Sequence, residues 1–198
     1  MTSTVDIANS ALRKIGAGII TSFSQGTPSA NFINDRYDEC RLELLRGHNW
    51  NFAKKRALLG RLSDEPAFEF NYFYQPPDDW VRTVRVHDND TGKGHIAYQE
   101  EGNRIAANSE DVYLLYIADV IDPNLMTPDF REALAFRIAM DGAVSLASSN
   151  ALFDRMAGSF DNAILKASST NAFGDRAQPL PRGSWVTSRS RSQSSWPE

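Results

Sequence analysis

Apolar positions along the first fifty residues recur with the period of an α-helix. They fall every three or four residues over 5–15, behind a serine–threonine cap, and Gly16 ends this predicted helix. A second helix is predicted over 28–46, with Gly47 as a left-handed terminator. The apolar stripe of this second helix contains Ile33, Tyr37, Cys40 and Leu44.

Between Trp50 and Ala118 the period of the apolar positions changes to two, which is typical of half-buried β-strands. The segments are short and separated by tight turns, so they predict an antiparallel meander. Residues 112–118 are apolar on both faces and are expected at the centre of the sheet. The other predicted strands cover 68–74, 80–86, 95–99 and 103–107.

Helical periodicity returns over 127–149 and 151–169. The first of these helices opens on Thr127-Pro128-Asp129, where a cap, a first-turn proline and a first-turn acid coincide. The sequence therefore predicts an α+β fold, mainly a bundle of four helices, with an antiparallel β-meander insertion and an extended C-terminal arm. The corresponding segments are an N-terminal helical pair at 1–49, the β insertion at 50–122, a second helical pair at 123–170 and the arm at 171–198.

The overall composition is that of a globular chain, with 198 residues, 41% of them hydrophobic, and a net charge of −4. This length favours a single domain. No segment approaches the roughly 18 consecutive apolar residues of a membrane span, and the N-terminus lacks the layout of a secretory signal, so we expect no membrane partner. The single cysteine, Cys40, excludes a disulfide framework and a zinc site built from several cysteines.

The last 28 residues differ in kind from the rest of the chain. They contain four arginines against Asp175 and Glu198, so their net charge is +2, whereas the first 170 residues carry −6. A serine- and proline-rich segment of this composition does not bury itself, and Trp185 and Trp196 are candidate anchors on a partner chain. The four arginines are Arg176, Arg182, Arg189 and Arg191, and the other basic cluster of the chain is Lys54-Lys55-Arg56. Both clusters could contact phosphates or an acidic partner, and the acidic body favours the second.

The side chains that could carry chemistry form no recognisable catalytic or metal-binding motif. His48 is expected to cap or stack at the end of the second helix, and His87 and His95 are expected to be solvated beside a turn. Cys40 lies on an apolar stripe, which favours burial over reactivity. We therefore expect no metal, no cofactor and no enzymatic activity.

Two pairs of adjacent acids, Asp78-Asp79 and Glu100-Glu101, fall in predicted turns. A glycosidase needs two carboxylates across a cleft in different environments, and adjacent turn acids provide neither. Two alternative functions stay open. One is a small hydrolase that degrades cell walls with Asp79, Glu101 and His95, and the other is an accessory protein that binds DNA with the tail arginines.

The order of three motifs along the chain resembles one known family. The first is IANSALRKIG near the N-terminus, the second is the Trp50-Asn51-Phe52 strand entry, and the third is YQPPDDWVRTVRV. Together they resemble the head-to-tail adaptor proteins of bacteriophages, called tail tubular protein A or gatekeeper in short-tailed phages. The chain departs from the pattern at Trp80-Val81, where an aliphatic pair is common. The matching residues are Asn9, Leu12, Ile15, Gly16, Trp50, Phe52, Pro77, Asp79, Val81 and Arg82.

This resemblance implies a structural protein of the virion, made in the host cytoplasm and placed at the head–tail junction. About twelve copies would form a ring between the portal and the tail nozzle or next tail protein. Double-stranded DNA would cross the ring during ejection without sequence-specific binding, and an acidic body suits this because negative walls repel phosphates. The predicted portal-contacting residues are Arg176, Arg182, Trp185, Arg189, Arg191 and Trp196, and the turns predicted to face the nozzle contain Asp78, Asp79 and Asp90.

Overall fold

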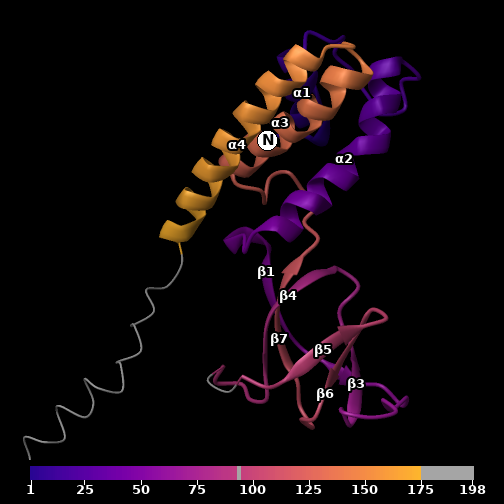
Figure 1. Ribbon diagram of the computed structural model, residues 1–198, viewed down its shortest axis with the longest axis vertical. Coiled ribbons are helices and arrows are strands. Elements are labelled where there is room, and N and C mark those ends of the chain that lie inside the picture. Colours follow the sequence, from indigo (N-terminus) through magenta and orange to yellow (C-terminus); the bar gives the residue numbers. More distant parts are fainter. Residues whose placement is uncertain (93–94, 175–198) are drawn as a thin grey trace, which may run out of the picture.

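The computed structural model describes residues 1–92 and 95–174, which form an elongated α+β molecule (Figure 1). Within these residues, four α-helices gather at one end and two small antiparallel sheets lie at the other (Figure 1). The predicted fold class is therefore confirmed, as is the order of helical pair, β insertion and helical pair.

Each of the four helices begins at a hydroxyl side chain that accepts a hydrogen bond from the first turn. Ser3 forms a capping box with Asp6, in which each side chain accepts from the other residue's backbone. A proline follows the capping threonine in two of the helices, and the sequence predicts this arrangement for the one that begins at Pro128. The helices and their caps are α1 (Thr4–Lys14, Ser3), α2 (Pro28–Gly47, Thr27), α3 (Pro128–Ser145, Thr127) and α4 (Asn150–Phe173, Ser149).

Trp50 ties the N-terminal helical pair to the C-terminal pair. The side chain is fully buried, and its indole nitrogen donates to the carbonyl oxygen of Leu44 at 2.8 Å. Its ring meets the ring of Phe130 edge-on, with centroids 5.1 Å apart. Because Phe130 lies in the first turn of α3, this aromatic contact fixes the two halves of the bundle against each other.

Helix α3 forms the centre of the bundle. Its apolar stripe of Phe130, Leu134 and Ile138 is fully buried. A methyl group added to Gly142 would come within 2.8 Å of the terminal carbon of Ile15, so α3 passes close to the end of α1 at this point. Large side chains therefore fill one part of α3, and a small residue permits close packing in another.

The first sheet has three antiparallel strands in the order β1-β7-β4, formed by β1 (Lys54–Leu58), β7 (Tyr113–Ala118) and β4 (Trp80–His87). The predicted central position of the 112–118 segment is confirmed. The second sheet has the order β2-β3-β6-β5, formed by β2 (Gly60–Arg61), β3 (Tyr72–Gln75), β6 (Arg104–Ala107) and β5 (Tyr98–Glu101). Tyr74, Val86 and Ile105 belong to a second core between these strands.

The predicted meander is wrong, because the strands pair across long stretches of sequence. β1 pairs with β7, and β3 pairs with β6, so consecutive strands are often not neighbours. The strand predicted over 68–74 is shorter, since β3 begins at Tyr72 and Phe68 is 80% exposed. Glu100 and Glu101 lie in β5 instead of in a turn. Alternation of aromatic residues alone did not distinguish the strand from the loop before it.

Three helix ends also differ from the prediction, and one of them is that of α3, which ends at Ser145 instead of residue 149. Gly16 has a φ of +70° and ends α1 as expected. Gly47, however, is part of α2, and His48 follows it with an extended backbone. Helix α4 continues to Phe173, past the end predicted at residue 169 and past the arm boundary predicted at residue 171.

Candidate assembly surfaces

A buried ion pair joins the helical bundle to the three-stranded sheet. Arg41 on α2 is 3% exposed, and its guanidinium pairs with the carboxylate of Asp119, the residue directly after β7. The same guanidinium donates to the carbonyl oxygen of Val120 at 3.2 Å and pairs with Asp38 at 3.1 Å. No sequence signal pointed to this role, because Arg41 falls among the polar positions beside the apolar stripe of α2.

Asp79 belongs to the same junction. Its carboxylate accepts hydrogen bonds from the Tyr116 hydroxyl at 2.9 Å and from the Lys55 ammonium at 2.7 Å. Its carbonyl oxygen accepts from the backbone amide of Asp119 at 2.7 Å. Partial burial opposes ionisation of Asp79, but the hydrogen bonds from Lys55 and Tyr116 outweigh it and lower the pKa. Asp79 therefore fixes the start of β4 against its neighbours, and its carboxylate is not an unbonded acid in a turn.

Two asparagines fasten the C-terminal end of α4 to the same region. The side-chain oxygen of Asn171 accepts from the backbone amide of Asn51 at 2.7 Å, and the Asn51 side chain donates back to the Asn171 carbonyl at 2.7 Å. The Asn171 amide also donates to the carbonyl oxygen of Asn49 at 3.0 Å. The C-terminal end of α4 therefore lies beside the entry into β1.

Helix α4 is covered on one side only. In its 24 residues, Met156 and Ala167 are buried, while Leu165 is 66% exposed. Several large apolar side chains of α4 are only partly buried against the bundle core, namely Leu152, Phe153, Phe160 and Ile164. The bundle thus leaves a mixed apolar and polar face along this helix.

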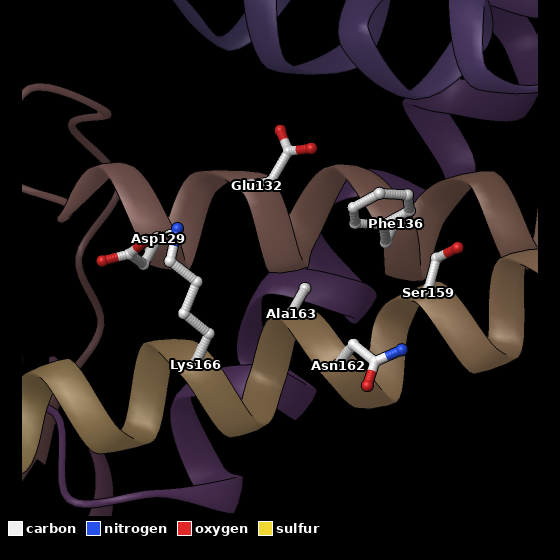
Figure 2. Close-up of a pocket in the computed structure, with 7 residues that line it drawn as sticks. All are labelled: Asp129, Glu132, Phe136, Ser159, Asn162, Ala163 and Lys166. Atoms are coloured by element: carbon white, nitrogen blue, oxygen red, sulfur yellow. Dashed lines mark ion pairs between the residues drawn. The ribbon is translucent and has the colours of Figure 1, made fainter.

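Two shallow grooves run beside α4. Figure 2 shows the first, a groove of about 340 Å³ between α3 and α4 with Ala163 at its floor. The Lys166 ammonium lies 3.3 Å from the Asp129 carboxylate and ties the helices at one end of this groove, while Phe136 lies toward the other end (Figure 2). The second groove, of about 400 Å³, is lined in part by Phe32, Val144 and Phe153.

The structure does not bring the three predicted nozzle-facing acids together. Asp78 and Asp79 precede β4 at the helical end of the sheet, whereas Asp90 follows the far end of β4. The predicted turn at 89–92 is confirmed, and Gly92 has a φ of +66°. The predicted portal-contacting residues, Arg176, Arg182, Trp185, Arg189, Arg191 and Trp196, lie outside the described residues.

The histidines and Cys40 are partly as predicted. His48 stacks edge-on against Trp50 with ring centroids 5.4 Å apart, as expected. Cys40 is fully buried, and burial raises the pKa of its thiol to about 11. The prediction that His87 is solvated is wrong, because it is 8% exposed and its ring lies 4.9 Å from the ring of His95. β4 extends one residue further than expected and carries His87 into the sheet.

The residues of the hydrolase alternative do not converge. Asp79 and His95 are separated by the length of β4, because the ring of His95 lies against His87 at the far end of that strand. At about 3.3 Å per residue this separation is roughly 25 Å. In the described part of the chain, no group of three or more histidine, cysteine or acidic residues is placed to hold a metal ion.

No protein-family model matches the chain, and no curated protein matches it either. Among the described residues, no helix is both long enough and apolar enough to span a bilayer.

Proposed function

We propose that this protein is a structural head-to-tail adaptor of a bacteriophage, which assembles as a ring of about twelve copies between portal and tail nozzle. The observation that carries the proposal is the one-sided burial of α4. A helix of 24 residues that fully buries only Met156 and Ala167 has more apolar surface than its own bundle covers. The resemblance of the motif order to phage adaptors points to copies of the same chain as the cover.

In the proposed ring, the helical pairs of neighbouring copies lie side by side. The contact is heterologous, so each copy offers the α4 face on one side and receives a neighbour on another, and rotation closes the ring. The grooves beside α4 provide the receiving surface. Val144, which is 49% exposed, and Phe153 place apolar atoms along one of them. Burial of these atoms by a neighbour would supply the main favourable free energy of assembly.

The two ends of the elongated body suit two different partners (Figure 1). The turn that contains Asp90 lies at the sheet end, away from the bundle, and is the part we assign to the tail nozzle. The Asn51–Asn171 hydrogen bonds fix the end of α4 at the junction of bundle and sheet. We assign residues 175–198, with their arginines and tryptophans, to the portal.

The charge distribution is compatible with a DNA conduit. The first 170 residues carry a net charge of −6, which would line the ring with negative charge. Such walls repel phosphates, so a duplex can slide through without being held. The proposal therefore assigns no base-reading or phosphate-gripping residue.

The ring is tested by imaging the purified full chain by electron microscopy and by measuring its mass. We expect Val144→Asp and Leu165→Asp to shift the particle toward monomer, because each places a charge in the proposed contact. Ser63→Asp, an exposed position at the sheet end, is the matched control and leaves the particle intact. If the wild type, the two contact variants and the control all give particles of the same mass, the proposed helical contact is contradicted.

The portal contact is tested by deleting residues 175–198, which keeps Asn171 and the end of α4 in place. The shortened chain is expected to keep its helical circular dichroism and to lose binding to the portal. Retained binding to the portal would contradict the assignment of the tail.

A further inference from the structure

Two strands of opposite charge lie at open sheet edges. In the described part of the chain, β1 pairs only with β7, and β5 pairs only with β6, so each strand has one free side. Free edges carry unpaired backbone donors and acceptors and are templates for pairing with another chain. In natural proteins, free edge strands are usually prevented from pairing by charged side chains or by a segment that covers them. Here β1 and β5 instead carry opposite charges.

The charges of the two edges are complementary. β1 begins with Lys54, Lys55 and Arg56, while β5 ends with Glu100 and Glu101. Arg56 and all four residues of β5 are exposed. Among the described residues, neither Arg56 nor Glu100 has an ion-pair partner, and Lys55 has only the half-exposed pair with Asp79.

One antiparallel register gives a charge pair or an apolar pair at three of the four residues of β5. If Arg56 stands opposite Glu100, the reversed direction of the second strand places Lys55 opposite Glu101 and Leu58 opposite Tyr98. Leu58 is 59% exposed and Tyr98 is 37% exposed, so the pairing also covers apolar surface. Opposite charges and aromatic–aliphatic pairs directly across two strands both stabilise a sheet.

Within one copy the two edges belong to different sheets and do not pair with each other. β1 is an edge of the three-stranded sheet, and β5 is an edge of the four-stranded sheet, where it pairs with β6. A contact between β5 and β1 is therefore made between copies, head to tail.

We infer that β5 of one copy adds to the free edge of β1 of a second copy, in the register that pairs Arg56 with Glu100. The occupant is a second copy because both complementary edges belong to the same chain. The contact is heterologous and repeats around a ring. The inference rests on the proposed function for the closed ring, but the strand contact itself is measurable without it.

Charge reversal tests the pair on the full chain by sedimentation over a range of concentrations. Arg56→Glu alone and Glu100→Arg alone should each raise the concentration for half-assembly roughly fivefold or more, since an attractive pair becomes a repulsive one. An equimolar mixture of the two variants should recover assembly, because alternating copies restore an acid opposite a base. Arg46→Glu and Glu110→Arg are exposed controls with the same changes of charge.

A disulfide trap tests the register. Ala57 and Gln99 stand opposite each other in the inferred pairing, so Ala57→Cys and Gln99→Cys in one chain should give a ladder of covalent oligomers on oxidation. Ala57→Cys alone should give no covalent oligomer larger than a dimer.

Each result decides the inference. Recovery of assembly by the mixture together with the ladder supports it. It is overturned if the wild-type chain stays monomeric at all concentrations, or if the charge variants assemble like the controls. If the charge variants assemble like the controls but electron microscopy shows a ring, the strand contact is overturned and the proposed function stands. If the mixture and the ladder behave as expected but the particles are not closed rings, the strand contact stands and the adaptor function is contradicted.

Discussion

The guanidinium of Arg41 pairs with the carboxylate of Asp119 at the point where the helical bundle meets the three-stranded sheet. Arg41 comes from the middle of α2, and Asp119 directly follows β7, so the pair joins segments 78 residues apart. The Arg41 side chain is 4% exposed and that of Asp119 is 26% exposed. Loss of one partner therefore leaves the other charge largely out of water.

Replacement of Arg41 by methionine is expected to lower the free energy of unfolding by about 3 kcal/mol, because Asp119 loses its buried partner. Urea unfolding followed by circular dichroism measures this change. Asp64→Ala is the control, since it breaks the exposed pair between Asp64 and Arg104 and should change stability by less than about 0.5 kcal/mol. Equal changes in the free energy of unfolding for the two variants would show that the Arg41–Asp119 pair stabilises the protein no more than an exposed ion pair does.

Asn171 is expected to hold the last turns of α4. Asn171→Ala removes the hydrogen bonds to Asn51 and Asn49 and should destabilise this end by about 1–2 kcal/mol. Backbone amides near the end of α4 would then exchange with solvent faster, as measured by hydrogen–deuterium exchange. Asn162→Ala removes only a bond to the Gly158 carbonyl within the helix and should leave the exchange of that end unchanged.

Asp141 makes the contact between α2 and α3 dependent on pH. Burial of its carboxyl group opposes ionisation, but hydrogen bonds from Arg36 and Arg137 prevail and lower the pKa below 3.8. Because the pKa is lowered by folding, the ionised group contributes stability above the unfolded value of about 3.9, and this contribution is lost as pH falls through the folded value.

We therefore expect Asp141→Asn to be less stable than the wild type at pH 7, with a difference that shrinks as the pH is lowered below about 4. Urea unfolding of both proteins at several pH values measures it. A difference that stays constant down to acid pH would contradict the role of the carboxylate charge.

Cys40 is expected to resist thiol reagents in the native state. Burial raises its pKa from 9.0 to about 11, so the thiolate population at pH 8 falls roughly a hundredfold, and the side chain is also out of contact with solvent. The rate of reaction with a chromogenic disulfide reagent, with and without urea, measures the protection. Fast reaction without urea would contradict the packing of α2 against α3.

Local signals predicted the helical part of the fold, because its ends are encoded by neighbouring residues. The sequence predicts the start of the second helix at residue 28 and that of the third at Thr127-Pro128-Asp129, and both starts are confirmed. Phe130, Leu134 and Ile138, which are spaced as on one face of a helix, are all buried in α3. The ends of the second, third and fourth helices differ from the prediction by one to four residues.

The β part was predicted less well, because strand pairing depends on contacts between distant residues. β1 carries two lysines and an arginine without apolar alternation, and no local pattern pointed to its pairing with β7. Phe68 and Phe70 alternate like a strand but precede β3. Arg41 and Asn171 were missed as candidate site residues for the same reason, since their roles arise only after the chain has folded.

The central claim is that copies of this chain close into a ring, and the mass of the native particle tests it most directly. Native mass spectrometry of the full chain, alone and with the portal protein, should give one closed species of about twelve copies, whose lumen admits a DNA duplex in electron micrographs. A chain that remains a monomer under both conditions would contradict the account.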